Sequence, residues 1–589
     1  MLVGGAVFLR RTFRNSIGTR TSIVPALSFG NADAFHDAYR CCACNSFATK
    51  NESLPMKKGI EKRTNTTTTT TTTQMSRREF RRRRYQVFLA VGSNQGDSFA
   101  NIATGIQLLC DPTFSNDSNS NYPYLPTEFV RSSFLYRTKP MYVTEQPSFW
   151  NGAVELDTDC DPASLLRRLK LVEEHLGRNF TQIRNGPRPL DLDILLYYDN
   201  NNGEKQSSEP LSASISTSTP VVVDTPDLVI PHCRLKEREF VLAPLIDIAG
   251  RHLIHPTASS NSTHEHASDN TLGGLLDNLV ASKENDGTDE PKAVRLLPLP
   301  RERFLVFDRT LIMGILNVTP DSFSDGGKWM GGVDLAVAQA MKMVDEGANI
   351  VDIGGESTRP GATEILVEEQ IRRTVPVIQA IRERSKGVVV SIDTRHAAVA
   401  RAAVEAGADI VNDVSGGTHD PNMLSTVADL QVPIVLMHMR GTPELMQRLT
   451  DYDDQGGVVD GVIGALLERS QAAEAAGIPR WMQVLDPGIG FAKDLDGNLS
   501  LLKNYSELRT KLGDFPLLLG TSRKGFIGKL SGETEAEKRD YGTVGSCVAA
   551  LCLGNSGNDN SLGCNILRVH NVKGAKQATA VMDAIVAAR

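Results

Sequence analysis

The sequence predicts two folded domains, a ferredoxin-like α+β domain followed by an α/β TIM (β/α)8 barrel. Three observations predict this fold class. The chain has 589 residues, which is too long for a single domain. Residues 85–256 give the element order β α β β α β and a further helix. Residues 301–589 repeat one unit eight times: a short apolar strand ends in a polar residue, and an amphipathic helix follows.

The amino-acid composition of the chain limits the kinds of binding partner that we expect. Hydrophobic content of 40% and charged content of 23% are ordinary for a globular protein. No apolar stretch reaches the roughly 18 residues that a membrane-spanning helix needs. A net charge of −7 does not favour electrostatic binding of nucleic acid by the chain as a whole. Of the nine cysteines, Cys41, Cys42 and Cys44 lie in the N-terminal segment and the others occur singly. No paired C-x-x-C and histidine spacing suggests a zinc site, so we expect reduced thiols. The sequence thus predicts neither a membrane nor a nucleic-acid partner.

The first 84 residues predict no folded domain. Residues 1–32 contain four arginines and no acid, a composition typical of an organellar transit peptide. This favours a mitochondrial location, with a plastid or cytoplasmic location as the alternative; a disordered tail without an address is the simpler interpretation. Residues 45–84 include an unbroken threonine run at 66–73 and an arginine cluster, and such polar tracts cannot bury a core.

The elements of the first domain follow from local patterns. We expect strands at residues 86–94, 128–136, 151–156 and 190–198, and helices at 99–110, 161–176 and 234–249. Pro162 at the first helical position and apolar residues at helical spacing predict the second helix. Two polar segments interrupt the pattern, an insertion at about 200–220 and a linker at 257–300, where we place the domain boundary.

Polar residues end all eight predicted barrel strands. They are Asn317, Asp352, Asp393, Asn412, His438, Asp486, Ser522 with Lys524, and Arg568 with His570. One such residue is usually only a turn signal. Active sites of a (β/α)8 barrel lie at the carboxyl ends of its strands, so eight polar ends in register predict a site there.

The strongest local signal in the first domain is the run Gly186-Pro-Arg-Pro-Leu-Asp-Leu-Asp-Ile194. Residues i and i+2 of a strand share a face, so Asp191 and Asp193 project side by side. Carboxylates beside basic residues suggest Mg²⁺ shared with the phosphates of a nucleotide. The basic residues available for those phosphates are Arg178, Arg188, His232 and Arg238. The simpler alternative is an exposed edge strand with alternating aspartates.

Several motifs of the first domain together carry a family resemblance. They are Gly92-Ser-Asn94, Tyr136-Arg-Thr138, Gln146-Pro147, the Gly186–Ile194 run and Ile230-Pro-His232. Over residues 85–255 the chain resembles 6-hydroxymethyl-7,8-dihydropterin pyrophosphokinase. The resemblance implies transfer of the ATP pyrophosphoryl group to the hydroxymethyl oxygen of the pterin, largely by positioning and charge neutralisation.

This resemblance also implies residue roles. Asp191 and Asp193 would hold two Mg²⁺, while Glu173, Arg178, Arg188, His232 and Arg238 would bind ATP and Thr138, Asn151 and Phe240 would bind the pterin. One departure is Asn185, where some family members place an aromatic residue over the pterin. The departure removes one expected stacking partner.

The barrel carries a second resemblance. Its motifs are Asn317-Val-Thr-Pro-Asp-Ser-Phe-Ser-Asp-Gly-Gly327, Gly354-Gly-Glu-Ser-Thr-Arg-Pro-Gly361, Leu485-Asp-Pro-Gly-Ile-Gly-Phe491, Ser522-Arg-Lys524 and Arg568-Val-His570. Over residues 305–587 the chain resembles dihydropteroate synthase. The resemblance implies condensation of the pyrophosphorylated pterin with p-aminobenzoate.

Roles in the barrel follow from the same resemblance. Asp393, Asn412, Asp486 and Lys524 would bind the pterin, and Phe323, Pro360, Phe491 and Ser522 would bind p-aminobenzoate. Asn317 would hold one Mg²⁺, and Thr358, Arg359, Arg568 and His570 the pyrophosphate. Asp352 would assist pyrophosphate departure. We further expect a mobile lid at residues 319–327 and a homo-oligomer formed through the barrel.

The two implied reactions are consecutive, which supports both assignments. We therefore predict a bifunctional folate-biosynthesis enzyme that uses ATP, 6-hydroxymethyl-7,8-dihydropterin, p-aminobenzoate and Mg²⁺. A corrinoid-linked methyltransferase barrel is one alternative, disfavoured by the Ser522-Arg-Lys and Arg568-Val-His motifs. A catalytically inactive scaffold is another, disfavoured because Asp191, Asp193, Lys524 and Arg568 are all present.

Overall fold

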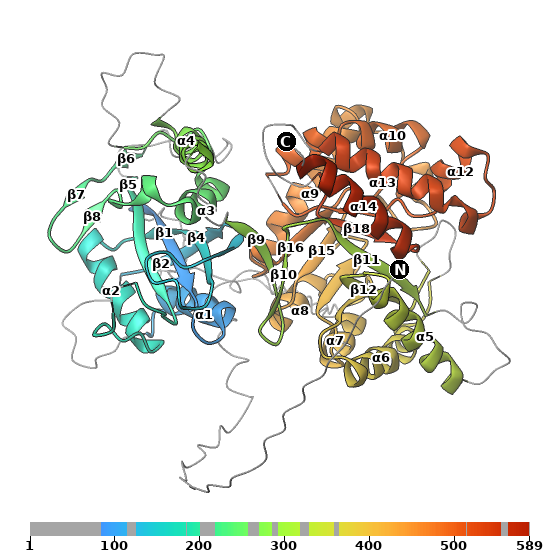
Figure 1. Ribbon diagram of the computed structural model, residues 1–589, viewed down its shortest axis with the longest axis horizontal. Helices are drawn as coiled ribbons and strands as arrows, with labels where there is room; N and C mark the ends of the chain where they lie inside the picture. Colours follow the sequence, from blue (N-terminus) through green and yellow to red (C-terminus); the bar gives the residue numbers. More distant parts are fainter. Residues whose placement is uncertain are drawn as a thin grey trace, which may run out of the picture. The chain divides into compact units, whose positions relative to one another are not determined.

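The structure is a computed structural model that contains two main sheets with their covering helices (Figure 1). It describes residues 84–114, 125–183, 185–200, 218–256, 270–285, 293–318, 329–357, 364–513, 515–554 and 563–587. The predictions for residues 1–83, for the insertion at 201–217 and for the lid at 319–327 lie outside the described residues.

The first sheet is antiparallel and centred on β1. Its strands include β1 (Tyr85–Ser93), β2 (Thr127–Ser132), β3 (Leu135–Thr138), β4 (Phe149–Thr158), β5 (Asp191–Asp199) and β6 (Thr219–Pro220). The helices of this part of the chain are α1 (Ser98–Cys110), α2 (Pro162–His175) and α3 (Glu239–Ala249). Strand β1 lies between β4 and β5 and pairs with both in antiparallel register. A separate two-stranded ribbon joins β7 (Val223–Asp224) to β8 (Val229–Ile230).

Alternation along β1 and β5 divides the sheet into two buried faces. Val87 and Leu192 belong to the apolar cluster shared with α1 and α2. Phe88 and Leu196 belong to the cluster shared with α3. Because side chains alternate along a strand, Asp191 and Asp193 emerge on the face opposite Leu192. Asp161 caps α2 by accepting from the amides of residues 163 and 164, as the Asp-Pro pattern predicts.

One predicted strand is interrupted. Instead of a continuous strand over residues 128–136, β2 and β3 are separated at Ser133 and Phe134. The Ser133 hydroxyl accepts from the Ala153 amide at 2.8 Å and donates to the Phe134 carbonyl at 2.6 Å. A side chain thus replaces a backbone partner at this point, and the ladder to β4 is broken.

The segment predicted as a linker, residues 257–300, differs most from expectation. It contains α4 (Leu272–Asn285) and β9 (Val294–Leu299), and β9 pairs with β3 and with β10 (Arg303–Val306). The apolar residues Leu272, Leu275, Leu276 and Leu279 pack against the α3 cluster. Their spacing of i, i+3, i+4 and i+7 is a helix signal that the polar composition of the segment obscured.

The second sheet is a nearly closed parallel barrel of eight strands. They are β11 (Leu311–Asn317), β12 (Ile350–Gly354), β13 (Val389–Asp393), β14 (Ile410–Asp413), β15 (Ile434–Met437), β16 (Gln483–Asp486), β17 (Leu518–Leu519) and β18 (Ile566–Val569). The order runs β16-β15-β14-β13-β12-β11-β18-β17, and a parallel bridge between Leu485 and Leu517 joins the two ends. The barrel prediction is therefore confirmed.

Helices surround the barrel (Figure 1). They are α5 (Trp329–Asp345), α6 (Val367–Arg384), α7 (Ala397–Glu405), α8 (Met423–Leu430), α9 (Val458–Ala475), α10 (Leu495–Lys503), α11 (Tyr505–Lys511), α12 (Gly525–Ser531), α13 (Asp540–Gly554) and α14 (Val572–Ala587). No helix within the described ranges has both the length and the apolar character needed to span a membrane.

Two candidate active sites

The first site is a pocket on the α3 side of the first sheet. Asp191 and Asp193 line it together with Asn151, Arg238 and Phe240. Strand β5 supplies the carboxylates, β4 supplies Asn151, and Phe240 stands on α3. A Cβ atom on Gly92 would lie 2.8 Å from Asn151 Oδ1, so the glycine leaves room for this amide in the pocket.

The two carboxylates of this pocket are electrostatically unequal. Arg178 Nη1 lies 2.5 Å from Asp191 Oδ1, and Arg188 Nη1 lies 3.1 Å from Asp191 Oδ2. Burial raises the pKa of Asp191, but Arg188 and Arg178 outweigh burial and hold that pKa below its usual value. Burial and the neighbouring Asp191 charge instead raise the pKa of Asp193, whose nearest ion-pair partner among the described residues, His232 Nε2, is 4.0 Å away. Asp193 therefore has the greater need for a bound cation.

Glu173 supports Arg178 from beneath the pocket. Its fully buried carboxylate accepts from Arg178 Nη1 at 2.6 Å, from Lys170 Nζ at 2.9 Å and from the Leu192 amide at 2.7 Å. Since both carboxylate oxygens already have partners within the fold, the structure favours positioning of Arg178 over the predicted nucleotide contact.

Two of the predicted pterin ligands, Asn151 and Phe240, line the pocket, and the third, Thr138, contacts Asn151. Asn151 Nδ2 donates to Thr138 Oγ1 at 2.7 Å, and both side chains are buried. The Arg238 guanidinium lies 5.6 Å from the centre of the Phe240 ring. These contacts fix the amide of Asn151 and place a cation beside the aromatic ring.

Sequence reasoning did not single out Phe149, an aromatic residue that contacts Arg188 next to this site. Phe149 pairs with Thr138 in the β3–β4 register and shares a strand face with Asn151. The Arg188 guanidinium lies 5.4 Å from the centre of its ring. Asn185 has a φ of 64°, a left-handed conformation that asparagine tolerates better than most residues. The i, i+2 spacing from Asn151 was the available signal for Phe149.

The second site lies at the carboxyl end of the barrel and is centred on Arg568 from β18. Arg568 Nε donates to Asp352 Oδ2 at 2.7 Å, and its Nη2 donates to Asp393 Oδ2 at 2.6 Å. Asn412 Nδ2 also donates to Asp352 Oδ2, at 3.1 Å. Among the described residues, Oδ1 of Asp352 and Oδ1 of Asp393 are buried without a hydrogen-bond partner. Two orphaned acceptors side by side indicate a place for a ligand that donates hydrogen bonds.

Burial dominates the electrostatics of this second site. It raises the pKa of Asp393 to about 7; Arg568 opposes this shift and Asp352 adds to it. Burial also lowers the pKa of Lys524 to about 8, although Asp486 opposes the shift. A carboxyl group and an amine that both titrate near neutral pH are typical of functional sites.

Lys524, Asp486 and Phe491 form the wall next to β16 and β17. Lys524 Nζ lies 4.4 Å from the centre of the Phe491 ring and donates to the Ile489 carbonyl. Asp486 accepts from the Gly488 amide at 2.7 Å, and burial raises its pKa. The wall therefore combines a cation, a carboxylate and an aromatic face.

The remaining predicted barrel residues divide into two groups. Ser522 Oγ and His570 Nδ1 are 2.9 Å apart, and Asn317 ends β11 with its side chain partly exposed. Thr358, Arg359, Pro360 and Phe323 lie outside the described residues.

Sequence reasoning also missed a buried lysine behind the Phe491 wall. Lys493 Nζ lies 2.9 Å from His438 Nδ1, and donates to the Gly488 carbonyl at 2.9 Å and the Phe491 carbonyl at 2.8 Å. Three acceptors match the three donors of an ammonium group. No periodic pattern marks Lys493, since lysine is almost never fully buried. Lys493 thus ties the segment that carries Phe491 to the end of β15.

These geometries define a transferase with two separate sites, one suited to phosphates and one to a polar heteroaromatic ring. Residues 88–250 match the family model of 7,8-dihydro-6-hydroxymethylpterin-pyrophosphokinase, and residues 313–570 match that of pterin binding enzymes. The chain is 38% identical to a folate synthesis bifunctional protein of Arabidopsis thaliana, over 86% of this chain and 96% of that protein. It is 37% identical to a mitochondrial folate synthesis bifunctional protein of Pisum sativum, over 85% and 89% of the two chains.

The chain belongs to the family of bifunctional folate synthesis proteins. It is a transferase that carries both the pyrophosphokinase step and the dihydropteroate synthase step. Among solved structures, dihydropteroate synthase of Xanthomonas albilineans with 4-aminobenzoic acid is 43% identical. That comparison covers 50% of this chain and all of the other, with a TM-score of 0.44.

Proposed function

We propose that the first pocket binds ATP and 6-hydroxymethyl-7,8-dihydropterin, and that Asp191 and Asp193 hold two Mg²⁺ between them and the phosphates. The raised pKa of Asp193 supports this fit, because a carboxylate destabilised by burial and by Asp191 is relieved by a cation. Mg²⁺ held by these carboxylates would neutralise charge on the phosphate oxygens.

Arg178, Arg188, His232 and Arg238 then hold the phosphates in line with the pterin hydroxyl. The hydroxymethyl oxygen loses its proton to solvent and forms a bond to the β-phosphorus, the bond from that phosphorus to the α-phosphate oxygen breaks, and AMP leaves. Glu173 acts through Arg178, because the two are joined at 2.6 Å and Glu173 is fully buried.

We infer that the pterin ring lies between Phe240 and Phe149, with Thr138 and Asn151 at its polar edge. Phe149 supplies the second aromatic that position 185 lacks. Its place opposite Thr138 and its shared face with Asn151 support this.

The strand order β5-β1-β4, with β2 and β3 beside β4, is also the order of a ferredoxin-like sheet, the fold that we propose for this domain.

In the barrel, we propose that Asp393, Asn412 and Asp486 pair with the pyrimidine edge of the pterin while Lys524 donates to its carbonyl. The observation that carries this proposal is the pair of buried, unpartnered oxygens on Asp352 and Asp393. A pyrimidine edge bears N–H donors at hydrogen-bond spacing, which such acceptors require.

The pyrophosphate lies against Arg568 and His570 in this proposal, with Thr358 and Arg359 from the adjoining segment. Asn317 offers one amide oxygen to a single Mg²⁺, and the pyrophosphate itself would supply further oxygen ligands. Bound there, Mg²⁺ neutralises the leaving group.

The transfer step exchanges one bond for another at the pterin methylene carbon. The carbon–oxygen bond to pyrophosphate breaks and leaves a delocalised cation, which the buried carboxylates of Asp352 and Asp393 stabilise. The amine of p-aminobenzoate then forms a carbon–nitrogen bond and loses a proton. Phe491 lines the approach of this amine and Ser522 binds the carboxylate. Phe323 and Pro360, the other predicted p-aminobenzoate ligands, lie outside the described residues.

One assay tests both halves of this proposal. Purified protein with hydroxymethyldihydropterin, ATP, Mg²⁺ and p-aminobenzoate is expected to yield dihydropteroate and AMP. Supplying the pyrophosphorylated pterin directly isolates the second step. Absence of dihydropteroate under both conditions would refute the proposed function, and full pyrophosphokinase activity in Asp193→Ala would refute the metal site of the first domain.

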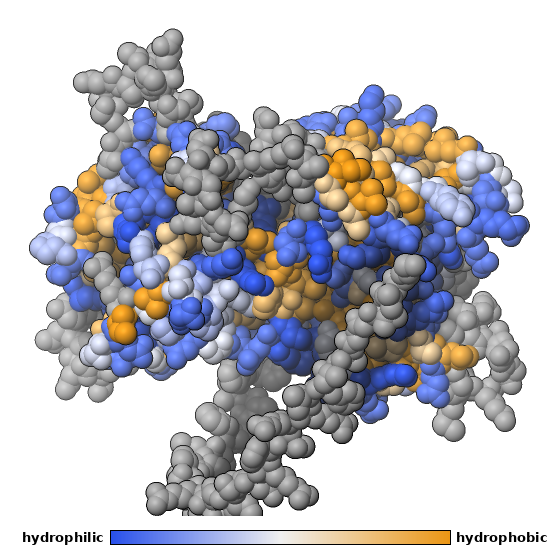
Figure 2. Space-filling view, in the orientation of Figure 1, coloured by the Kyte–Doolittle hydropathy of each residue, from blue (hydrophilic) through white to orange (hydrophobic). Residues whose placement is uncertain are grey.

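We also propose that the barrel associates with a second copy of this chain through α13 and α14. Leu553, Val581 and Ile585 are 46%, 60% and 61% exposed on these helices, and Figure 2 shows hydrophobic surface in this region. Light scattering should give a dimer for the wild type and a monomer for Val581→Glu; a monomeric wild type would contradict this.

The mitochondrial names of two relatives support a mitochondrial location, which import of a tagged chain would test.

A further inference from the structure

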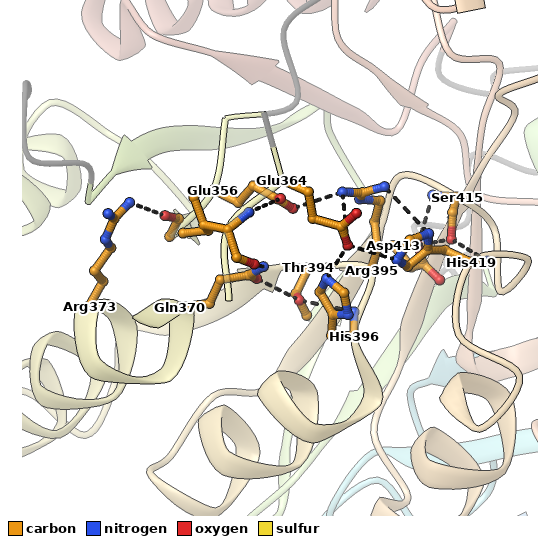
Figure 3. Close-up of polar contacts among 12 residues, drawn as sticks. Glu356, Glu364, Gln370, Arg373, Thr394, Arg395, His396, Asp413, Ser415 and His419 are labelled. Atoms are coloured by element: carbon orange, nitrogen blue, oxygen red, sulfur yellow. Dashed lines mark hydrogen bonds and ion pairs between the residues drawn. The ribbon is translucent and has the colours of Figure 1, made fainter. Parts of the chain in front are cut away.

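Three side chains that neither reaction uses converge at the rim of the barrel. Glu364 precedes α6, His396 is the N-cap residue of α7, and His419 lies between β14 and α8. Figure 3 shows the carboxylate of Glu364 directed between the two imidazole rings. The loops after three consecutive barrel strands therefore each contribute one metal-ligating side chain.

The spacing of the ligating atoms matches a tetrahedral metal centre. Glu364 Oε1 lies 3.2 Å from His396 Nε2 and 3.2 Å from His419 Nε2, and all three ligating atoms lie within 4.8 Å of one another. Zinc binds such nitrogen and oxygen ligands at about 2.1 Å, which separates neighbouring tetrahedral ligands by roughly 3.4 Å. The two separations that involve Glu364 thus already fit a shared ion, and the two imidazole nitrogens lie within 4.8 Å of each other.

A hydrogen bond does not explain the contact between His396 and Glu364. His396 Nε2 is buried and has no hydrogen-bond partner among the described residues, although Glu364 Oε1 is 3.2 Å away. An N–H group at this distance that makes no hydrogen bond does not point at the oxygen. Ligands of a common ion point at the ion rather than at one another, and a 3.2 Å contact without a hydrogen bond fits that arrangement.

The neighbourhood holds the two histidines in place. Their rings meet edge to face with centres 4.9 Å apart. The His396 amide donates to Thr394 Oγ1 at 3.2 Å, and the His419 amide donates to Ser415 Oγ at 3.2 Å. Both ligand positions are therefore fixed by the backbone before any ion binds, which lowers the entropic cost of binding.

Among the residues that the structure describes, Arg395 is the cation in contact with this cluster and opposes the binding of a metal ion. Its Nη2 lies 3.9 Å from Glu364 Oε1, and its Nη1 lies 3.5 Å from His419 Nδ1. The buried carboxylate of Glu356 accepts from the same guanidinium at 3.1 Å and balances its charge. A neutral His419 that ligates through Nε2 carries its proton on Nδ1, so Arg395 must turn from His419 toward Glu356 when the ion binds.

We propose that Glu364, His396 and His419 bind one divalent transition-metal ion of the zinc class, with a water molecule as fourth ligand. Two imidazoles and one carboxylate favour zinc or cobalt over magnesium, which prefers oxygen ligands alone. The site is separate from the proposed magnesium sites and contains none of the residues assigned to either reaction.

Cobalt provides a spectroscopic test on the full chain. Accessible thiols, including Cys233 and Cys552, are first alkylated, and excess Mg²⁺ occupies the oxygen-rich sites. Titration with Co²⁺ is expected to give one equivalent with the intense visible absorption of a four-coordinate site, displaced by Zn²⁺. His396→Gln and Glu364→Gln should each lose this equivalent or bind it at least tenfold more weakly.

The exposed His252 provides the matched control. His252→Gln should bind Co²⁺ like the wild type. Circular dichroism and synthase activity, assayed with the pyrophosphorylated pterin, show whether each variant is folded. Folded His396→Gln that retains the four-coordinate spectrum with unchanged affinity would overturn the proposal, as would a wild type that shows no saturable Co²⁺ absorption.

Discussion

Substitution of Asp393 tests whether a residue proposed to bind substrate lowers the stability of the barrel. Its pKa rises from 3.8 to about 7, chiefly through burial. A folded-state pKa above the unfolded value means that folding is most favourable at low pH and loses stability as pH rises toward 7. A shift of about 3 units corresponds to about 4 kcal/mol, which is an upper bound on the penalty at pH 8.

Asp393→Asn keeps the shape of the side chain but cannot ionise. At pH 4 its stability should be close to that of the wild type, and at pH 8 it should be more stable by up to about 4 kcal/mol. For a domain of this size that is roughly 10 °C in melting temperature. Synthase kcat/KM should nevertheless fall roughly a hundredfold, because a charged acceptor for the pterin is lost.

Differential scanning calorimetry of the full chain from pH 4 to 8, following the barrel transition, tests this expectation. Asp420→Asn is the control, for which we expect the opposite change in stability. Backbone amides, including that of Ala397, hold the pKa of Asp420 below its usual value despite partial burial. That variant should therefore be less stable than the wild type above pH 4. A melting-temperature difference for Asp393→Asn that does not change with pH would refute the reasoning.

Three further outcomes are expected. Burial lowers the pKa of Lys524 to about 8, so synthase kcat/KM should fall above pH 8 as the ammonium group loses its proton; an unchanged rate at pH 9 would exclude this role. Asp193→Asn should lower pyrophosphokinase turnover by roughly a hundredfold or more and leave the synthase step unchanged, as separate assays of the two steps would show. Lys493→Met removes a donor from the Phe491 carbonyl, so KM for p-aminobenzoate should rise more than KM for the pterin substrate. The exposed Lys503→Met is its control, and equal changes in both KM values would indicate general destabilisation instead.

Local patterns were sufficient for the main elements and their strand ends. Each predicted barrel strand is present, and Asp393 and Asp486 end theirs as predicted. Alternation likewise placed Asp191 and Asp193 on one face of β5. The helix α4 was not predicted, although four leucines occur at helical spacing, because the segment around them is polar in composition.

Partners distant in sequence could not be predicted. Glu173 was expected to contact nucleotide, and its contacts to Arg178, to Lys170 and to the Leu192 amide could not be read from the sequence. Lys493 gave no sequence signal, because its three acceptors are supplied by a loop and a strand end brought together only in the fold.

The sequence by itself determined which residues stand at the strand ends, because strand length and side-chain alternation are local properties of the chain. The tertiary structure alone decided how these residues pair. Arg568 meets Asp352 across 216 residues of sequence, and that contact exists only because β18 closes the barrel beside β11. The same closure leaves one oxygen of Asp352 and one of Asp393 buried without a hydrogen-bond partner among the described residues, and it raises the pKa of Asp393. Glu364, His396 and His419 likewise meet only because three consecutive parallel strands end at one rim.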